Sequence, residues 1–188
     1  MAVKKLTYTL SFEDYKKEFE VICKYNPVEV GQYWIIEFLI RSLLKNDLCI
    51  INVSTRRSTK NRQEEKYKSP TGFPDLVIIN TKNKDVPVQC AIEVKFPIHN
   101  NILDDDKYLE QVYGHIDKFK NVIYTDGIYW RFYKDGKKKS SKTINLGTIK
   151  NNDSKINVEF NENASNDWDN LLDTITNFLN NLKESAIK

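Results

Sequence analysis

Two apolar segments of the chain carry charged residues that are able to bind a metal ion or to transfer a proton. The segment Val88–Phe96 contains Glu93 and Lys95, and the segment Asp75–Asn80 begins with an acid. Because side chains alternate across a β-strand, Glu93 and Lys95 point to the same face when their segment is extended. Burying such charges among apolar residues costs free energy unless something compensates them. A carboxylate and an ammonium side by side in this strand therefore indicate a functional site.

The strand context makes this acid-x-Lys triplet informative, because the spacing alone does not. Acid-x-Lys triplets occur six times in the chain, and only Glu93-Val94-Lys95 lies inside an apolar strand. The other five lie in predicted helix starts, turns or polar loops, where charges are ordinarily solvated, and they begin at Asp14, Glu64, Asp105, Asp135 and Asp153. The alternative for Asp75, Glu93 and Lys95 is a structural ion pair at a strand end.

The chemistry that these residues could support is metal-dependent hydrolysis of a phosphodiester. A hard cation such as Mg²⁺ prefers carboxylate oxygens, backbone carbonyls and water as ligands. Asp75 and Glu93 would supply carboxylates, and Val94 would supply its carbonyl. The metal would polarise a phosphate and acidify a bound water, while Lys95 holds that water or offsets charge in the transition state. We expect Mg²⁺ as the cofactor, with Mn²⁺ able to substitute.

A series of short strands is predicted to position these residues. The strands Asp75–Asn80 and Val88–Phe96 are joined by a polar turn, and if they pair as a hairpin, Asp75 can reach Glu93. Asp126-Gly127 is a hairpin-turn signal. Further strands are predicted at Leu48–Ser54, Val122–Thr125, Ile128–Tyr133 and, at an edge, Ile144–Leu146.

Four helices are predicted around these strands. A short helix starts at Ser11, runs through Ile22 and is stopped by Asn26-Pro27, and the others cover Val30–Leu44, Asp104–Phe119 and residues 165–183. The order of helices and strands predicts an α/β fold with a mixed β-sheet flanked by helices. With 188 residues, the chain is expected to form one domain, 1–188.

The two charged motifs resemble those of the PD-(D/E)xK nuclease superfamily. The resemblance rests on Pro74-Asp75 and Glu93-Val94-Lys95, and it covers residues 30–133. The stretch NVIYTDGIYWRFY at 121–133 is also similar to the nuclease modules of type I and related restriction enzymes. The resemblance implies a restriction-endonuclease-like fold, and it implies that the whole chain is a nuclease domain whose core lies at 30–133.

The resemblance also implies two further site residues on helices. Glu37 matches the glutamate of the helix before the core strands, and Gln111 matches the glutamine of the helix after the lysine strand. The superfamily motif often has a tyrosine four residues after that glutamine, whereas this chain has His115. The alternative for Glu37 is an ion pair with Arg41, and the alternative for Gln111 is an exposed polar position.

The charge distribution is compatible with a polyanionic partner. The net charge is +3, but the segment from Asp153 onward holds seven acids and three lysines, so the preceding part is distinctly basic. Four residues of one polar loop could contact DNA phosphates, and the alternative for them is a solvated loop. These residues are Arg56, Arg57, Lys60 and Arg62.

The leading hypothesis is a Mg²⁺-dependent DNA endonuclease of restriction or phage defence, either stand-alone or a module of a larger restriction enzyme. Its expected partners are DNA and a second copy or other restriction subunits. One alternative is an inactive nuclease-like fold that binds nucleic acid or protein, and another is RNA as the substrate. The three dispersed cysteines, the lack of a signal-peptide pattern and the lack of a long apolar run predict a cytoplasmic protein without membrane spans.

Overall fold

The computed structural model describes residues 10–44, 47–54, 62–82, 88–152 and 155–184. Its α-helices are α1 (Phe12–Tyr25), α2 (Glu29–Leu43), α3 (Asp106–Phe119) and α4 (Ala164–Glu184). Its strands are β1 (Leu48–Asn52), β2 (Leu76–Asn80), β3 (Val88–Val94), β4 (Val122–Thr125), β5 (Tyr129–Tyr133), β6 (Lys142–Asn145), β7 (Gly147–Asn152) and β8 (Lys155–Phe160). Short 3₁₀ helices occupy Arg62–Tyr67 and Ile102–Asp104.

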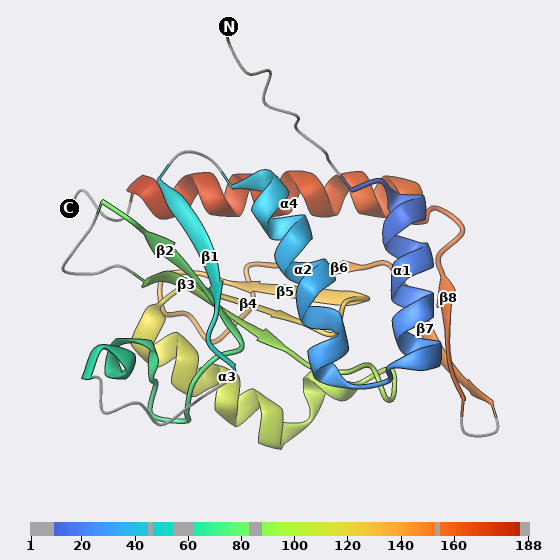
Figure 1. Cartoon of the computed structure of the whole chain (residues 1–188), viewed down its shortest axis with the longest axis horizontal. Helices are drawn as coiled ribbons and strands as arrows, with labels where there is room; N and C mark the ends of the chain where they lie inside the picture. Colours follow the sequence, from blue (N-terminus) through green and yellow to red (C-terminus); the bar gives the residue numbers. More distant parts are fainter. Residues whose placement is uncertain (1–9, 45–46, 55–61, 83–87, 153–154, 185–188) are drawn as a thin grey trace, which may run out of the picture.

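Six strands form one mixed sheet in the order β1-β2-β3-β4-β5-β6. Only β3 and β4 are parallel, and α3 is the connection that returns the chain between them. The hairpin of β2 and β3 pairs Leu76 with Ile92, which places Asp75 beside the carboxyl end of β3. β7 and β8 form a separate antiparallel ribbon beside α1 (Figure 1).

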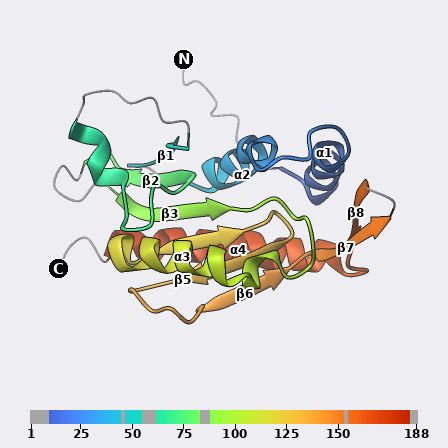
Figure 2. The same ribbon diagram turned by 90° about the horizontal axis from the view of Figure 1, so that it is seen from below.

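The two faces of the sheet are covered by different helices, and each face has its own apolar core. Figure 1 shows α3 and α4 on opposite sides of the strands, and Figure 2 shows α2 and α3 on opposite sides of β3. The helices α1, α2 and α4 share one apolar core, and α3 belongs to the other. Alternate residues of the strands divide between the two cores, so that Ile92 and Val94 face the α1–α2–α4 side and Ala91 faces α3. Glu93, which lies between Ile92 and Val94, therefore points to the α3 side.

Local signals in the sequence explain where the helices begin. The Ser11 hydroxyl accepts a hydrogen bond from the backbone N–H of Asp14 at 3.1 Å, and the Asp105 carboxylate accepts one from the N–H of Lys107 at 3.0 Å. The run of acids at 104–106 is thus the start of α3 and not a metal cluster. Among the described residues, no helix has both the length and the apolar character needed to span a membrane.

The structure confirms the α/β class, the four helices and the mixed sheet, and it differs from the prediction at two places. The β7–β8 ribbon was not predicted. In β8, Ile156, Val158 and Phe160 alternate with polar residues and could have indicated a strand, whereas β7 has Ile149 as its single large apolar residue. Part of the predicted polar loop, Arg62–Tyr67, forms a 3₁₀ helix. Arg56, Arg57 and Lys60 lie outside the described residues, and Arg62 is described only as the start of this helix.

Candidate active site

The structure brings Asp75, Glu93 and Lys95 together where β2 begins and β3 ends. The backbone N–H of Asp75 donates to the carbonyl of Ile92 at 3.1 Å, and the Asp75 Oδ2 atom accepts a hydrogen bond from the N–H of Val94 at 2.8 Å. The Asp75 side chain therefore bonds the β3 backbone directly. The predicted hairpin geometry, in which Asp75 can reach the neighbourhood of Glu93, is confirmed.

Glu93 is held from two sides by cationic or polar groups. Its Oε1 atom accepts a hydrogen bond from Lys95 Nζ at 2.7 Å, and its Oε2 atom lies 3.1 Å from His115 Nε2. Only 1% of Glu93 is exposed. Burial of a carboxylate to this degree requires such partners, because an unpaired charge in the interior is strongly unfavourable.

His115 links Glu93 to the loop that carries Ser69. Its Nδ1 atom lies 2.8 Å from the hydroxyl oxygen of Ser69, so both ring nitrogens have partners. Gly114 makes this approach possible, since a Cβ atom there would lie 2.1 Å from Thr71 Oγ1. His115 therefore orients Glu93, and the loop at Ser69 in turn orients His115.

The surroundings of Asp75 disfavour the ionised form of its carboxyl group. Burial raises the pKa of Asp75 to about 7, the charge of Glu93 adds to this, and hydrogen bonds from Tyr33 and Val94 oppose it. The Tyr33 hydroxyl lies 2.5 Å from Asp75 Oδ1 and 3.0 Å from Glu29 Oε1. A phenol has one hydrogen and can donate to only one of these acids at a time.

Helix α2 contributes Glu29 and Tyr33 to the site. Lys95 Nζ lies 3.6 Å from Glu29 Oε2, and the Tyr108 ring of α3 lies 5.0 Å from the same ammonium. Burial alone would lower the pKa of Lys95, but Glu93 and Glu29 raise it above its usual value. Lys95 is therefore a cation at neutral pH, enclosed by groups from α2, β3 and α3.

One continuous network results from these contacts. It runs from Ser69 through His115, Glu93, Lys95, Glu29 and Tyr33 to Asp75 and the N–H of Val94. Apart from His115, the network contains three carboxylates and one lysine, so full ionisation of these four groups leaves two negative charges in excess. This excess matches the charge of one divalent cation.

Glu37 is not part of this network, and it lies where the alternative interpretation placed it. Its carboxylate forms an ion pair with Arg41 one turn later on α2, and Arg41 also donates to the carbonyl of Ile50 at 2.9 Å. Glu29 lies two turns earlier on the same side of the helix and reaches the site instead. Glu29 and Tyr33 were missed because residues at i, i+4 and i+8 share a face, and the sequence does not show which turn meets the end of β3.

Gln111 is placed on α3 one turn before His115. Its backbone carbonyl accepts a hydrogen bond from the Thr71 hydroxyl at 2.8 Å, which helps to fix the loop that carries Ser69. His115, and not the side chain of Gln111, makes the contact with Glu93. The signal for His115 was its position in the buried face of α3, at helical spacing with Val112, Ile116 and Phe119.

The donor set fits a hard cation held by few protein ligands. Among the described residues, no group of three or more His, Cys, Asp and Glu side chains is arranged to hold a metal. Mg²⁺, however, is commonly bound through one or two carboxylates, with water and substrate phosphate completing its shell. Asp75 and Glu93 each use two of about four acceptor positions in the contacts above. In a strand, the N–H and C=O of one residue point the same way, so the carbonyl of Val94 lies on the Asp75 side.

Comparison with solved structures identifies the architecture. The cryo-EM structure of a DrdV–DNA complex matches this chain with a TM-score of 0.55 and 15% sequence identity. The chain has a restriction-endonuclease-like fold. The match covers 87% of this chain but only 13% of the matched chain, and at this identity it shows the fold alone. No protein-family model matches the chain, and no curated protein matches its sequence.

The two glutamates of α2 provide a test of which turn of the helix serves the site. If the network cleaves DNA with Mg²⁺, as the sequence predicts, Glu29→Gln should slow cleavage by about 10–100-fold, because groups that orient metal ligands typically have effects of this size. Glu37→Gln should leave the rate within about twofold, because Glu37 pairs with the half-exposed Arg41 and contacts no member of the network in the hydrogen bonds and ion pairs of the described residues. Initial cleavage rates of the two variants and the wild type check this. A larger loss of rate in Glu37→Gln than in Glu29→Gln would place Glu37, and not Glu29, in the site.

Proposed function

We propose that the protein is a Mg²⁺-dependent endodeoxyribonuclease that hydrolyses phosphodiester bonds. The observation that carries this proposal is the convergence of Asp75, Glu93 and Lys95 at one end of the sheet, in a network that contains three carboxylates and one lysine. A purely structural ion pair would need one acid for its lysine. The restriction-endonuclease-like fold and its likeness to a protein solved with DNA support DNA as the substrate.

The residues of the network have distinct tasks in this proposal. Asp75, Glu93 and the carbonyl of Val94 would hold Mg²⁺, which supplies charge neutralisation at the phosphate and a water of lowered pKa. Tyr33 and the N–H of Val94 fix the orientation of Asp75, and His115 fixes Glu93. Lys95 presents a permanent positive charge that can stabilise the pentacovalent phosphate or hold the attacking water.

Restriction or phage defence is the setting that we propose for this activity. The chain spans 13% of the matched DrdV chain, so it corresponds to one module of that longer protein. Other modules or a second copy would then supply sequence recognition and the second strand cut. A single site of this kind cuts one strand at a time.

The decisive experiment is cleavage of supercoiled plasmid in the presence of Mg²⁺, Mn²⁺ or EDTA. We expect nicking by the wild type with either metal, none with EDTA, and a loss of at least about 100-fold in Asp75→Ala. Asp117→Ala is the matched control, because Asp117 is a half-exposed acid of α3 that pairs with Lys138 and not with a residue of the network. A labelled RNA of the same sequence, digested in parallel, decides between the two nucleic acids.

Two results would contradict the proposal. Cleavage by Asp75→Ala at the wild-type rate would show that the nicking arises elsewhere. Salt-sensitive DNA binding without metal-dependent cleavage, on supercoiled, linear and single-stranded DNA alike, would favour the alternative of an inactive nuclease-like fold.

A further inference from the structure

The β7–β8 ribbon has two outer edges, and they differ in how their backbone groups are satisfied. At the β7 edge, the carboxamide of Asn100 acts as a short substitute for a neighbouring strand. Its nitrogen donates to the carbonyl of Ile149 at 3.2 Å, and its oxygen accepts from the N–H of Ile149 at 2.5 Å. The Gly147 N–H on the same edge donates to the Asn145 side chain at 2.9 Å. The β7 edge is thus capped by side chains.

The register of the ribbon shows which backbone groups point to the outer edge of β8. The backbone groups of Ile149 point to Asn100 and away from β8, so Ile149 and Val158 form a non-hydrogen-bonded pair. In such a pair, the N–H and C=O of both residues point outward. By alternation, Ile156 and Phe160 also direct their backbone groups to the outer edge of β8. Within the described part of the chain, no strand pairs with this edge.

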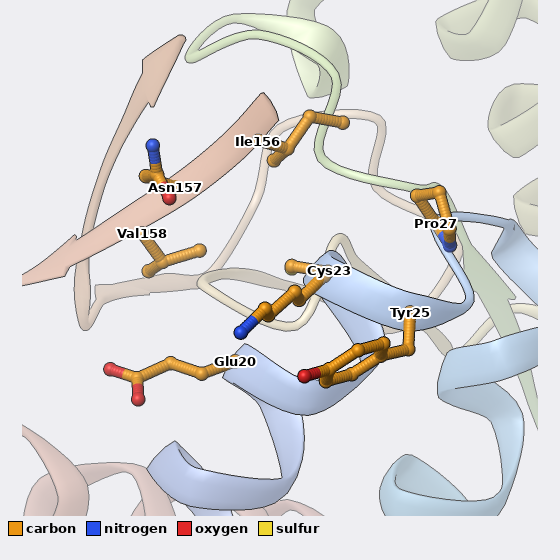
Figure 3. Close-up of a pocket in the computed structure, with 8 residues that line it drawn as sticks. Glu20, Cys23, Tyr25, Pro27, Ile156, Asn157 and Val158 are labelled. Carbon is orange, nitrogen blue, oxygen red and sulfur yellow. The ribbon is translucent and has the colours of Figure 1, made fainter. Parts of the chain in front are cut away.

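A cavity of about 750 Å³ lies between β8 and the C-terminal half of α1, two elements that pack against each other. It is lined by Ile156, Asn157 and Val158 of β8 and by Glu20, Cys23 and Lys24 of α1. Figure 3 shows the β8 residues on one side of the cavity and Tyr25 and Pro27 on the other, with Cys23 of α1 between them. The cavity is therefore a groove with two walls and a helical floor.

We propose that this groove binds an extended peptide segment of a partner protein, which adds a strand to β8. Strand addition uses backbone hydrogen bonds for affinity and side-chain contacts for specificity. Tyr25 and Pro27 bound the groove across from β8, and the occupant that we propose is a single extended segment. This site is separate from the nuclease network, and the proposal does not depend on the proposed function.

The charges of the groove indicate what the segment carries. Lys24 is engaged with the Tyr25 ring at 4.9 Å, whereas Glu20 lines the groove and forms none of the ion pairs seen among the described residues. Cys23 and Val158 contribute apolar surface. The segment should therefore alternate apolar side chains, which face Cys23 and Val158, with a lysine or arginine that meets Glu20.

Hydrogen exchange of the backbone amides tests the edge itself. In the free protein, the amides of Val158 and Phe160 should exchange fast, whereas those of Asn157 and Glu159, which bond to β7, should be protected. Addition of a peptide selected from a displayed library of short random peptides should protect Val158 and Phe160. If these two amides are already protected, the edge is covered and the proposal is wrong. Protection that rises with protein concentration alone would show a second copy as the occupant and would also overturn it.

Variants of the edge test the bound peptide. Val158→Pro removes the outward N–H at a position where an edge strand tolerates proline. It should raise the dissociation constant of the selected peptide about tenfold. Val158→Ala, which keeps the N–H, should bind within a few fold, and thermal melts establish that both variants fold. Glu20→Lys should lower the affinity for the peptide, whereas Glu18→Lys, which lies outside the groove, should leave the affinity unchanged. Failure to select any peptide that Val158→Pro weakens would overturn the proposal.

Discussion

Replacement of Lys95 by methionine is expected to reduce Mg²⁺-dependent plasmid cleavage about 1,000-fold, because one preorganised charge at a reacting centre is typically worth this much. The ammonium lies 2.7 Å from Glu93 Oε1 and 3.6 Å from Glu29 Oε2, and only 6% of the residue is exposed. Its position is thus fixed before any substrate arrives. Methionine keeps the unbranched stem and removes the charge, so the substitution isolates the electrostatic contribution.

The measurement is the initial rate at which supercoiled plasmid becomes nicked, with the wild type and the variant at matched concentrations. Lys82→Met is the control, since Lys82 forms a solvated ion pair with Asp47 and 75% of its side chain is exposed. Its rate should stay within about twofold of the wild type. Cleavage by Lys95→Met within about tenfold of the wild type would remove Lys95 from the chemistry.

The strand residues of the site could be predicted from the sequence because local rules place them. The alternation of a strand puts Glu93 and Lys95 on one face, and the short connection between β2 and β3 brings Asp75 to the end of β3. Both rules act within about twenty residues of chain. The central strands and the helices were predictable for a similar reason, since each carries a clear apolar period.

The helix residues of the site could not be predicted because their positions depend on packing between elements. Glu29 and Glu37 lie on the same side of α2, eight residues apart, and each follows the helical spacing equally well. The way in which α2 packs on the sheet decides that the first turn meets Lys95 and that the third turn meets Arg41. A family motif with a glutamate on this helix does not resolve that choice.

The contact of His115 and the free edge of β8 are two further features that could not be predicted from the sequence. The contact of His115 with Glu93 joins residues 22 positions apart, and it depends on Gly114 admitting the Ser69–Gly72 loop. The openness of the β8 edge depends on a side chain from another part of the chain, Asn100, which satisfies β7 and not β8. Neither feature leaves a periodic pattern in the sequence.

The metal-free protein is expected to lose stability as the pH rises from about 4 to about 7. Asp75 has a pKa of about 7 in the folded protein and an ordinary value near 3.8 when unfolded. The folded state therefore binds the proton more tightly, so its advantage is complete below the unfolded pKa and disappears as the pH passes the folded pKa. Asp126, whose pKa burial raises to about 6, adds to this slope. Asp75→Asn should flatten the slope and leave the part due to Asp126.

Mg²⁺ should reverse this loss, because a divalent cation replaces the proton at Asp75. At about 100 times its dissociation constant, a ligand stabilises the folded state by about 2.7 kcal/mol, which corresponds to roughly 5–10 °C in Tm for a chain of this size. The gain should be larger at about pH 8 than at about pH 6, since protons compete with the cation only at the lower pH. Thermal melts with and without Mg²⁺ check this, and Asp75→Asn should lose most of the gain. Asp126→Asn should keep the gain, because Asp126 bonds to the backbone of the β4–β5 turn and not to the network. An equal gain at both pH values, or a full gain in Asp75→Asn, would place the cation elsewhere.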